Sequence, residues 1–228
     1  MTNVEGTDGW ERRPVTQPRL VLASASPARR RVLAAAGIDA QVVLSGVDES
    51  IVDAARPDTL CAVLARLKAR AVAEKLRHGS GPVDGVLVLG CDSVLGFEGE
   101  ALGKPGDAAE AVARWRRMRG REGVLYTGHT LVDLGTARTA EAVADTRVFF
   151  ADVSDEEVDA YVATGEPLEV AGAFTIDGFG SPFVERIDGD PGTVLGLSLP
   201  LLRRLLAELD IPITALWRRS SSALPPTI

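Results

Sequence analysis

Leu20-Val-Leu-Ala-Ser-Ala-Ser-Pro-Ala-Arg-Arg-Arg-Val-Leu33 is the stretch that decides the fold, because it joins an apolar strand to a helix through two serines. The apolar run predicts a strand over 19–23. Serine is a preferred N-cap residue and proline is preferred at the first helical position, so Ser26-Pro27 predicts a helix start. We expect this helix over 27–36, where Gly37 fits a C-terminal cap.

The same junction has the chemistry of an anion site. The free N–H groups and the positive dipole end of a helix favour a bound anion. Hydroxyl and guanidinium groups add donors suited to phosphate, and here they are Ser24, Ser26, Arg29 and Arg30. The stretch therefore predicts a polyphosphate-binding site where the strand meets the helix.

Strand and helix patterns alternate at first, and paired strands follow. We expect further strands over 41–44, 85–90, 124–134 and 142–150. We expect further helices over 59–76, 108–118, 155–163 and 199–209. The Gly-rich stretch 172–187 predicts two short strands around a tight loop. This order predicts an α/β fold with a mixed sheet rather than a purely parallel one.

Length and composition limit the class of protein. The 228 residues fit a disordered extension over 1–18, a single α/β domain over 19–212 and a tail over 213–228. The net charge of −7 leaves no broad basic field, so we expect no nucleic-acid partner. Without an apolar run near ~20 residues or a secretory signal, we expect a cytoplasmic protein with no membrane partner. Cys61 and Cys91 fit buried free thiols.

Two carboxylates are candidates for catalysis. The apolar run 85–90 predicts a buried strand with Cys91-Asp92-Ser93 at its C-terminal end, where ligands bind in open α/β sheets. Asp92 is the candidate general base, and the alternative is a residue that caps the next turn. Glu49, in the acidic loop 46–49, is either a solvated loop residue or a partner of Asp92 in holding Mg²⁺ or Mn²⁺.

Two lysines are candidates for stabilising phosphate charge. Lys104 follows a predicted hairpin over 96–103, and Lys68 is either a surface residue of its helix or a site residue. The sequence before Lys104 fails the phosphate-loop pattern, because the glycine spacing is wrong and Pro105 replaces the required serine or threonine. His78 and His129 are the only histidines, which leaves little for a nucleophile activated by histidine.

Taken in order, these motifs resemble the Maf family of nucleoside triphosphate pyrophosphatases. The resemblance runs over about residues 19–210. Besides the opening stretch it rests on Val47-Asp-Glu49, Leu64-Ala-Arg-Leu-Lys68-Ala, Gly90-Cys-Asp-Ser93, Leu102-Gly-Lys-Pro105, Tyr126-Thr-Gly128, Glu166-Pro-Leu, Ala171-Gly-Ala-Phe, Gly178-Phe-Gly180 and Val194-Leu-Gly-Leu-Ser-Leu-Pro200.

The resemblance implies a fold and an activity. The implied fold is an ITPase-like, elongated mixed sheet flanked by helices, with two lobes around a central cleft. The implied reaction is hydrolysis of the α–β phosphoanhydride of a nucleoside triphosphate to a monophosphate and pyrophosphate, with a divalent metal such as Mg²⁺ or Mn²⁺. The family is commonly dimeric, which implies a homodimer.

The resemblance also implies roles for individual residues. Asp92 matches the proton acceptor, and Glu49, Lys68 and Lys104 match charged residues of the cleft. Ser24, Ser26 and Arg29 match the phosphate-binding signature, and Glu49 with Asp92 would hold the metal.

Three positions bear on the choice of base. Members acting on dTTP and UTP usually carry Arg at the position of Ala28, Thr at Ser93 and Gln at Asp177. The branch acting on 7-methyl-GTP tends to carry Trp, Gln and Glu there. This chain matches neither set, and a methylated or otherwise non-canonical triphosphate stays open. An acidic Asp177 suits a base with an N–H edge, such as guanine or cytosine.

Two other functions stay open. One is a nucleotide-binding regulator of cell division and septum formation without turnover. The other is a phosphomonoesterase, which would release orthophosphate from nucleoside monophosphates.

Overall fold

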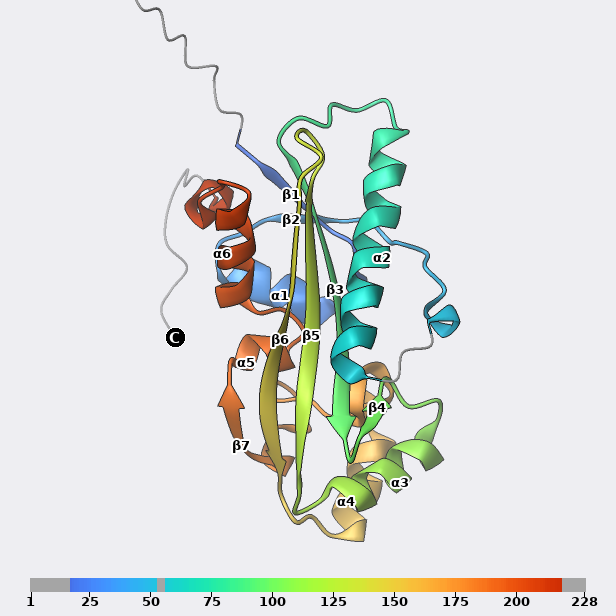
Figure 1. The fold of residues 1–228 in the computed structure, drawn as a ribbon. Helices are drawn as coiled ribbons and strands as arrows, with labels where there is room; N and C mark the ends of the chain where they lie inside the picture. Colours follow the sequence, from blue (N-terminus) through green and yellow to red (C-terminus); the bar gives the residue numbers. More distant parts are fainter. Residues whose placement is uncertain (1–16, 53–55, 219–228) are drawn as a thin grey trace, which may run out of the picture.

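The molecule is built around a seven-stranded mixed sheet (Figure 1). The computed structural model describes residues 17–52 and 56–218. The sheet has the strand order β2-β1-β3-β5-β6-β7, and β4 also pairs with β3. The strands are β1 (Arg19–Leu22), β2 (Ala40–Val42), β3 (Val86–Phe97), β4 (Glu100–Leu102), β5 (Glu122–Asp133), β6 (Thr139–Phe150) and β7 (Val184–Gly189). The pairs β1–β2 and β1–β3 are parallel and the others are antiparallel, which confirms the mixed α/β sheet.

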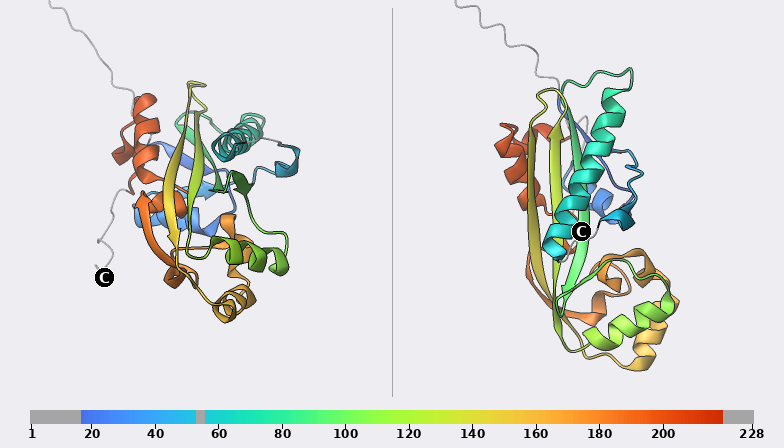
Figure 2. Two further views of the ribbon diagram at one scale, coloured as in Figure 1. Left: turned by 60° about the horizontal axis from the view of Figure 1, so that its bottom comes forward. Right: turned by 45° about the vertical axis from the view of Figure 1, so that its right-hand side comes forward.

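Helices cover the sheet in two groups, one toward each end of the long strands (Figure 2). Near one end, α2 (Pro57–Arg77) lies on one face, and α1 (Pro27–Ala35) and α6 (Leu199–Glu208) lie on the other. Toward the opposite end lie α3 (Ala108–Met118) and α4 (Asp155–Ala163). We call these two ends the α2 lobe and the α3 lobe.

Alternate side chains of β1 and β3 point to opposite faces of the sheet and belong to two separate cores in the α2 lobe. Leu20 and Leu22 pack with α1 and α6, whereas Val21 and Ala23 pack with α2. In β3, Leu87, Leu89 and Cys91 belong to the first core, and Val86 and Val88 belong to the second. Because successive side chains of a strand point to opposite faces, Gly90 and Asp92 lie on the α2 face, and Ser93 lies on the α1 face.

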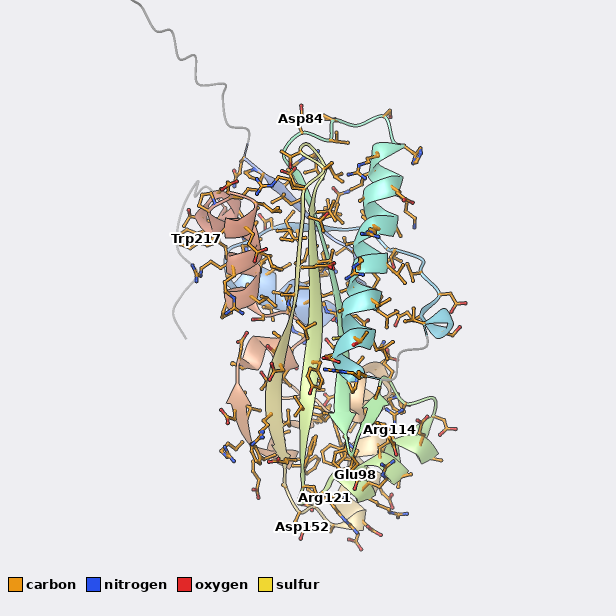
Figure 3. All side chains as sticks on the ribbon, viewed as in Figure 1. Asp84, Glu98, Arg114, Arg121, Asp152 and Trp217 are labelled. Atoms are coloured by element: carbon orange, nitrogen blue, oxygen red, sulfur yellow. The ribbon has the colours of Figure 1, made fainter. Side chains whose placement is uncertain are left out.

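The α3 lobe has its own core around Trp115. Its ring makes edge-on contacts with Phe150, Tyr161 and Phe183 at centroid distances of 5.7, 5.6 and 5.9 Å. Its indole N–H donates to the carbonyl of Ala173 at 2.7 Å, which satisfies the one polar atom of this buried ring. Ionic contacts, including Arg121 with Glu98 at 2.5 Å, lie at the outer end of this lobe, far from Asp84 (Figure 3).

The two lobes meet at a gap in one edge of the sheet. β1 pairs with β3 only as far as Leu22 opposite Leu89, and β4 begins to pair with β3 at Leu95. Between these points, residues 90–94 of β3 have β5 on one side and no strand on the other. We call this stretch the edge gap. It places the main chain around Asp92 next to the C-terminal end of β1.

The edge gap corrects one prediction from the sequence. Asp92 lies within β3 and not after its end, because β5 stays paired with β3 through Gly96. The neighbouring strand β1 is the one that ends, so the carboxyl end of a strand still lies beside Asp92.

Three other predicted elements differ. Of the two strands predicted within 172–187, the second forms as β7, which begins at Val184, and the first is wrong, since the region before β7 forms short turns (η3, Ala171–Ala173; η4, Ser181–Phe183). The reason is that its glycines and tight turns favour 3₁₀ geometry over pairing. α2 begins at Pro57 rather than residue 59, and β6 begins at Thr139 rather than residue 142.

The predicted ends lie mostly outside the described residues, namely 1–16 of the extension and 219–228 of the tail. The first part of the predicted tail forms η5 (Ile213–Leu216), in which Leu216 is buried against the core of α1 and α6. Cys61 and Cys91 are buried free thiols, and burial raises the pKa of each to about 12. Among the described residues, no helix is both long and apolar enough to cross a membrane.

Candidate active site

The strand–helix junction forms as the sequence predicts. Ser26 is the N-cap of α1, and its hydroxyl accepts from the backbone N–H of Arg29 at 3.5 Å. Ser24 accepts from the backbone N–H of Ser26 at 3.2 Å and from Nη1 of Arg29 at 2.8 Å. Two acceptances use both lone pairs of the Ser24 hydroxyl, so its proton is left to donate. A half-buried hydroxyl that can only donate suits a phosphate oxygen.

Arg29 is buried and ties three parts of the molecule together. Its Nε donates to the carbonyl of Gly196 at 2.8 Å, and Nη1 also donates to the carbonyl of Cys91 in the edge gap at 2.8 Å. Nη2 donates to the hydroxyl of Ser93 at 3.1 Å. Only one N–H of the guanidinium is then left without an acceptor among these bonds. Arg29 therefore holds Ser24 and the edge gap in place, and its positive charge lies where an anion would bind.

Ser93 is the first member of a directed chain of hydroxyls. Thr127 in β5 donates to the carbonyl of Thr193 at 2.8 Å, so Thr127 must accept the proton of Ser93 across 2.9 Å. Ser93 in turn accepts from Arg29. The proton of Ser93 and one of its lone pairs are thus used inside the protein, which ties this predicted specificity residue to the position of Arg29.

A buried charge cluster lies on the other face of the edge gap. Nζ of Lys68 in α2 lies 2.5 Å from Oδ1 of Asp92 and 2.7 Å from Oε1 of Glu49. Lys68 and Asp92 are only 8% and 6% exposed, whereas the Glu49 side chain is half exposed. The structure therefore brings three predicted site residues together, and Lys68 is a buried residue of its helix rather than a surface one.

Burial controls the protonation of Asp92. Loss of solvent raises the pKa of its carboxyl above the ordinary aspartate value, and the charges of Lys68 and Arg29 oppose that rise. A carboxylate with a raised pKa is a stronger base near neutral pH. Asp92 does not cap a turn, since it lies inside a strand.

Two glycines allow α2 to approach the sheet closely enough for this contact. A Cβ on Gly90 would lie 2.2 Å from the carbonyl oxygen of Ala65, and one on Gly128 would lie 2.4 Å from that of Cys61. Both contacts are with the backbone of α2, which cannot turn aside. Gly90 and Gly128 are thus positioning residues for Lys68, a role that the sequence motifs did not reveal.

Other predicted residues lie apart from this cluster. Lys104 is 62% exposed, and its ammonium lies 3.7 Å from Glu169. Arg30 is exposed and lines a surface hollow of about 350 Å³ together with Asp39. Ala28 is half-buried in the first turn of α1. The structure does not place these three residues in contact with Asp92.

Asp177 contacts a residue that the sequence analysis missed. Its Oδ2 accepts from Nη2 of Arg31 at 2.7 Å, which links the loop of the α3 lobe to α1. The sequence analysis also missed the structural roles of one carboxylate, Glu166, and one imidazole, His129. Glu166 binds the backbone of the loop after Asp177. His129 accepts from the N–H of Ser198, the N-cap of α6, and burial lowers its pKa to about 4, so it is neutral and structural.

Comparison with known proteins places the chain in a family. The family model described as Maf-like protein matches residues 19–209. The chain belongs to the Maf family. It is 66% identical to a nucleoside triphosphate pyrophosphatase of Salinispora tropica over 91% of each chain. It is 56% identical to the protein of that name from Streptomyces avermitilis, over 87% of this chain and 94% of the relative. The matched Maf region contains the edge gap and both groups of candidate residues.

Proposed function

We propose that the chain hydrolyses the α–β phosphoanhydride of a nucleoside triphosphate to a nucleoside monophosphate and pyrophosphate. The observation that supports this most is the cluster of Lys68, Asp92 and Glu49 on one face of the edge gap, with the serines at the start of α1 tied to the same gap through Arg29. A cation, a raised-pKa base and hydroxyl donors at one edge gap are the groups that water attack on a phosphoanhydride needs. The names of the relatives support the same activity.

Each group has a distinct role in this proposal. Ser24, Ser26 and the N-terminus of α1 bind the triphosphate, with the charge of Arg29 beneath them. Asp92 uses only Oδ1 in the hydrogen bonds of the described residues, so Oδ2 is available to take a proton from the attacking water. Lys68 keeps Asp92 oriented and offsets the negative charge that develops on phosphate oxygens in the transition state.

The carboxylates fit a divalent cation. Among residues 17–52 and 56–218, no group of three or more His, Cys, Asp or Glu side chains is placed to hold a metal ion alone. Mg²⁺ and Mn²⁺ are usually held by one or two carboxylates and completed by substrate phosphates and water. Asp92 and Glu49 converge on one ammonium, so they also suit a cation between them. When bound, the metal would neutralise charge on the triphosphate and polarise it for attack.

Further features belong to the proposal. Lys104 lies on a short segment after β4 and would contact the polyphosphate only once the nucleotide is bound. Ala28, Ser93 and Asp177 would border the base, whose identity stays open. We also propose a homodimer in the cytoplasm with no nucleic-acid or membrane partner, in accord with the resemblance and the net charge of −7.

The test compares two aspartate-to-asparagine variants. Purified protein with Mg²⁺ or Mn²⁺ is assayed against standard and methylated triphosphates, with pyrophosphate and orthophosphate measured separately. We expect pyrophosphate from the wild type, none from Asp92→Asn, and wild-type release from Asp152→Asn, since Asp152 is exposed at the far end of the α3 lobe.

Other outcomes would favour the alternatives. Binding without turnover of any triphosphate would indicate a nucleotide-sensing regulator. Orthophosphate from nucleoside monophosphates would indicate a phosphomonoesterase. Full activity of a folded Asp92→Asn would remove Asp92 from its role.

A further inference from the structure

One carboxylate fixes the loop that carries Asp177. Oε1 of Glu166 accepts from the backbone N–H of Gly180 at 2.9 Å and from the hydroxyl of Tyr161 at 3.0 Å. Oε2 accepts from the backbone N–H of Phe179 at 2.9 Å. Hydrogen bonds to an ionised acceptor are roughly twice as strong as those between neutral groups. Three of them on one side chain give the segment 177–180 a defined conformation before any ligand binds.

Two glycines leave room for this carboxylate. A Cβ on Gly178 would lie 2.1 Å from Oε2 of Glu166, and the next two atoms that it would meet also belong to Glu166. A Cβ on Gly180 would lie 2.3 Å from the hydroxyl oxygen of Tyr161. Neither glycine has a positive φ, so space and not backbone conformation excludes a side chain at these positions. The loop sequence is thus matched to Glu166 and Tyr161.

The anchor of the loop is itself rigid. Tyr161 packs edge-on against Trp115 and Phe183 in the core of the α3 lobe. Burial and the neighbouring carboxylate of Glu166 both raise the pKa of the Tyr161 hydroxyl, so it stays protonated and donates to Glu166. The carboxylate therefore connects the loop to the aromatic core of the α3 lobe.

The loop presents two groups suited to a nucleobase. Phe179 is 69% exposed although its backbone N–H is fixed by Glu166. Asp177 reaches α1, where one of its oxygens accepts from Arg31 at 2.7 Å. An exposed aromatic ring can stack on a base, and a carboxylate can accept from its N–H edge. The contact with Arg31 places Asp177 beside the helix of the phosphate signature.

We propose that Glu166 is a positioning residue for base selectivity, holding Asp177 and Phe179 in a preformed loop that recognises the nucleobase. This rests on the proposed function for the presence of a nucleotide. Glu166 touches neither phosphate nor water in this account, so its loss changes which base is preferred more than how fast the preferred nucleotide is cleaved.

The first experiment measures kcat/KM for a panel of triphosphates in Glu166→Gln and in Glu185→Gln, a matched change at an exposed position of β7. The amide places an NH₂ group against backbone or tyrosine donors, so at least one loop hydrogen bond is lost. We expect the kcat/KM ratio between the best and poorest bases to fall at least tenfold in Glu166→Gln. We expect kcat for the best base to change less than threefold, and Glu185→Gln to match the wild type.

A double-mutant cycle separates this role from general damage. Gly178→Ala introduces the 2.1 Å contact with Glu166 and should reduce base selectivity in the wild-type background. In a Glu166→Ala background the contact is gone, so Gly178→Ala should have no further effect. Urea unfolding identifies the variants that are folded under assay conditions.

Three results would overturn the inference. These are unchanged base selectivity in folded Glu166→Gln, an equal loss of kcat/KM for every base, and additive effects in the cycle. If the wild type releases no pyrophosphate, the proposed function fails separately. Base selectivity is then read from the dissociation constants of α,β-methylene triphosphates in calorimetry, where unchanged ratios in folded Glu166→Gln contradict the inference and a tenfold fall supports it.

Discussion

Replacing Gly90 by alanine tests whether the close approach of α2 creates the charge cluster. The added Cβ would lie 2.2 Å from the carbonyl oxygen of Ala65 and 2.7 Å from the amide nitrogen of Ala69, whereas ordinary contact begins at 3.4 Å. The helix and the sheet must therefore separate by about 1.2 Å at this point. Overpacking of this kind lowers the free energy of unfolding by about 1–3 kcal/mol.

The same displacement acts on catalysis. Lys68 lies on this part of α2, and its 2.5 Å contact with Asp92 would lengthen beyond hydrogen-bonding distance. A misplacement of about 1 Å near the reacting groups costs about 10²-fold in rate. We expect kcat for pyrophosphate release to fall by about this factor in protein that urea unfolding shows to be folded.

The control for this prediction is Gly81→Ala. A Cβ on Gly81 would meet nothing within 4 Å, and this glycine also has no positive φ, so both rate and stability should match the wild type. A folded Gly90→Ala enzyme with wild-type kcat would refute the view that α2 contact positions Lys68. A loss of activity that disappears on cooling would show that unfolding alone was responsible.

Three further predictions concern protonation, charge and metal. Burial lowers the pKa of His129 to about 4, so the unfolded state takes up a proton first as pH falls. The free energy of unfolding should drop by about 2 kcal/mol from pH 7 to 5. In urea titrations His129→Gln should flatten this slope, and an unaltered slope would contradict the assignment. Lys68→Met leaves Asp92 buried without its partner and should lower the free energy of unfolding by about 3–5 kcal/mol. Adding Asp92→Asn to Lys68→Met should restore part of the lost free energy of unfolding, and no recovery would argue against coupling between Lys68 and Asp92. EDTA should stop pyrophosphate release and Mg²⁺ or Mn²⁺ should restore it, whereas turnover in EDTA would exclude a metal role.

Local sequence signals predicted the junction and the mixed sheet well. Ser26 and Pro27 act within one turn of helix, and their capping chemistry depends on few other residues. The motifs follow one another in the order typical of the Maf family, and this order predicted membership of that family correctly, since the matching family model spans residues 19–209. The fold class followed from the same order of strands and helices.

The position of Asp92 was harder to predict, because it depends on neighbouring strands. The apolar run of β3 ends at Gly90, yet the strand continues because β5 pairs with it to Gly96. The edge gap results from β1 ending early, which only the pairing register reveals. The sequence could not decide whether Lys68 is a surface residue or a site residue for the same reason. Lys68 reaches Asp92 only because Gly90 lets α2 lie close to the sheet.

Contacts between distant segments were not visible in the sequence. Arg29 was predicted to bind phosphate, but most of its N–H groups serve Gly196, Cys91, Ser24 and Ser93. The ion pair of Asp177 with Arg31 joins the two lobes across 146 positions of sequence. The roles of Lys104, Ala28 and Arg30 stay predictions, since none of them contacts the charge cluster.

The most direct test of the central claim is the identity of the first products. The wild type is mixed with Mg²⁺ and each nucleoside triphosphate in turn, and the phosphorus NMR spectrum is followed from the start of the reaction. For at least one base, pyrophosphate and nucleoside monophosphate should rise in equal amounts with no orthophosphate. Orthophosphate rising together with nucleoside diphosphate would place the cleavage at the β–γ bond and contradict the account.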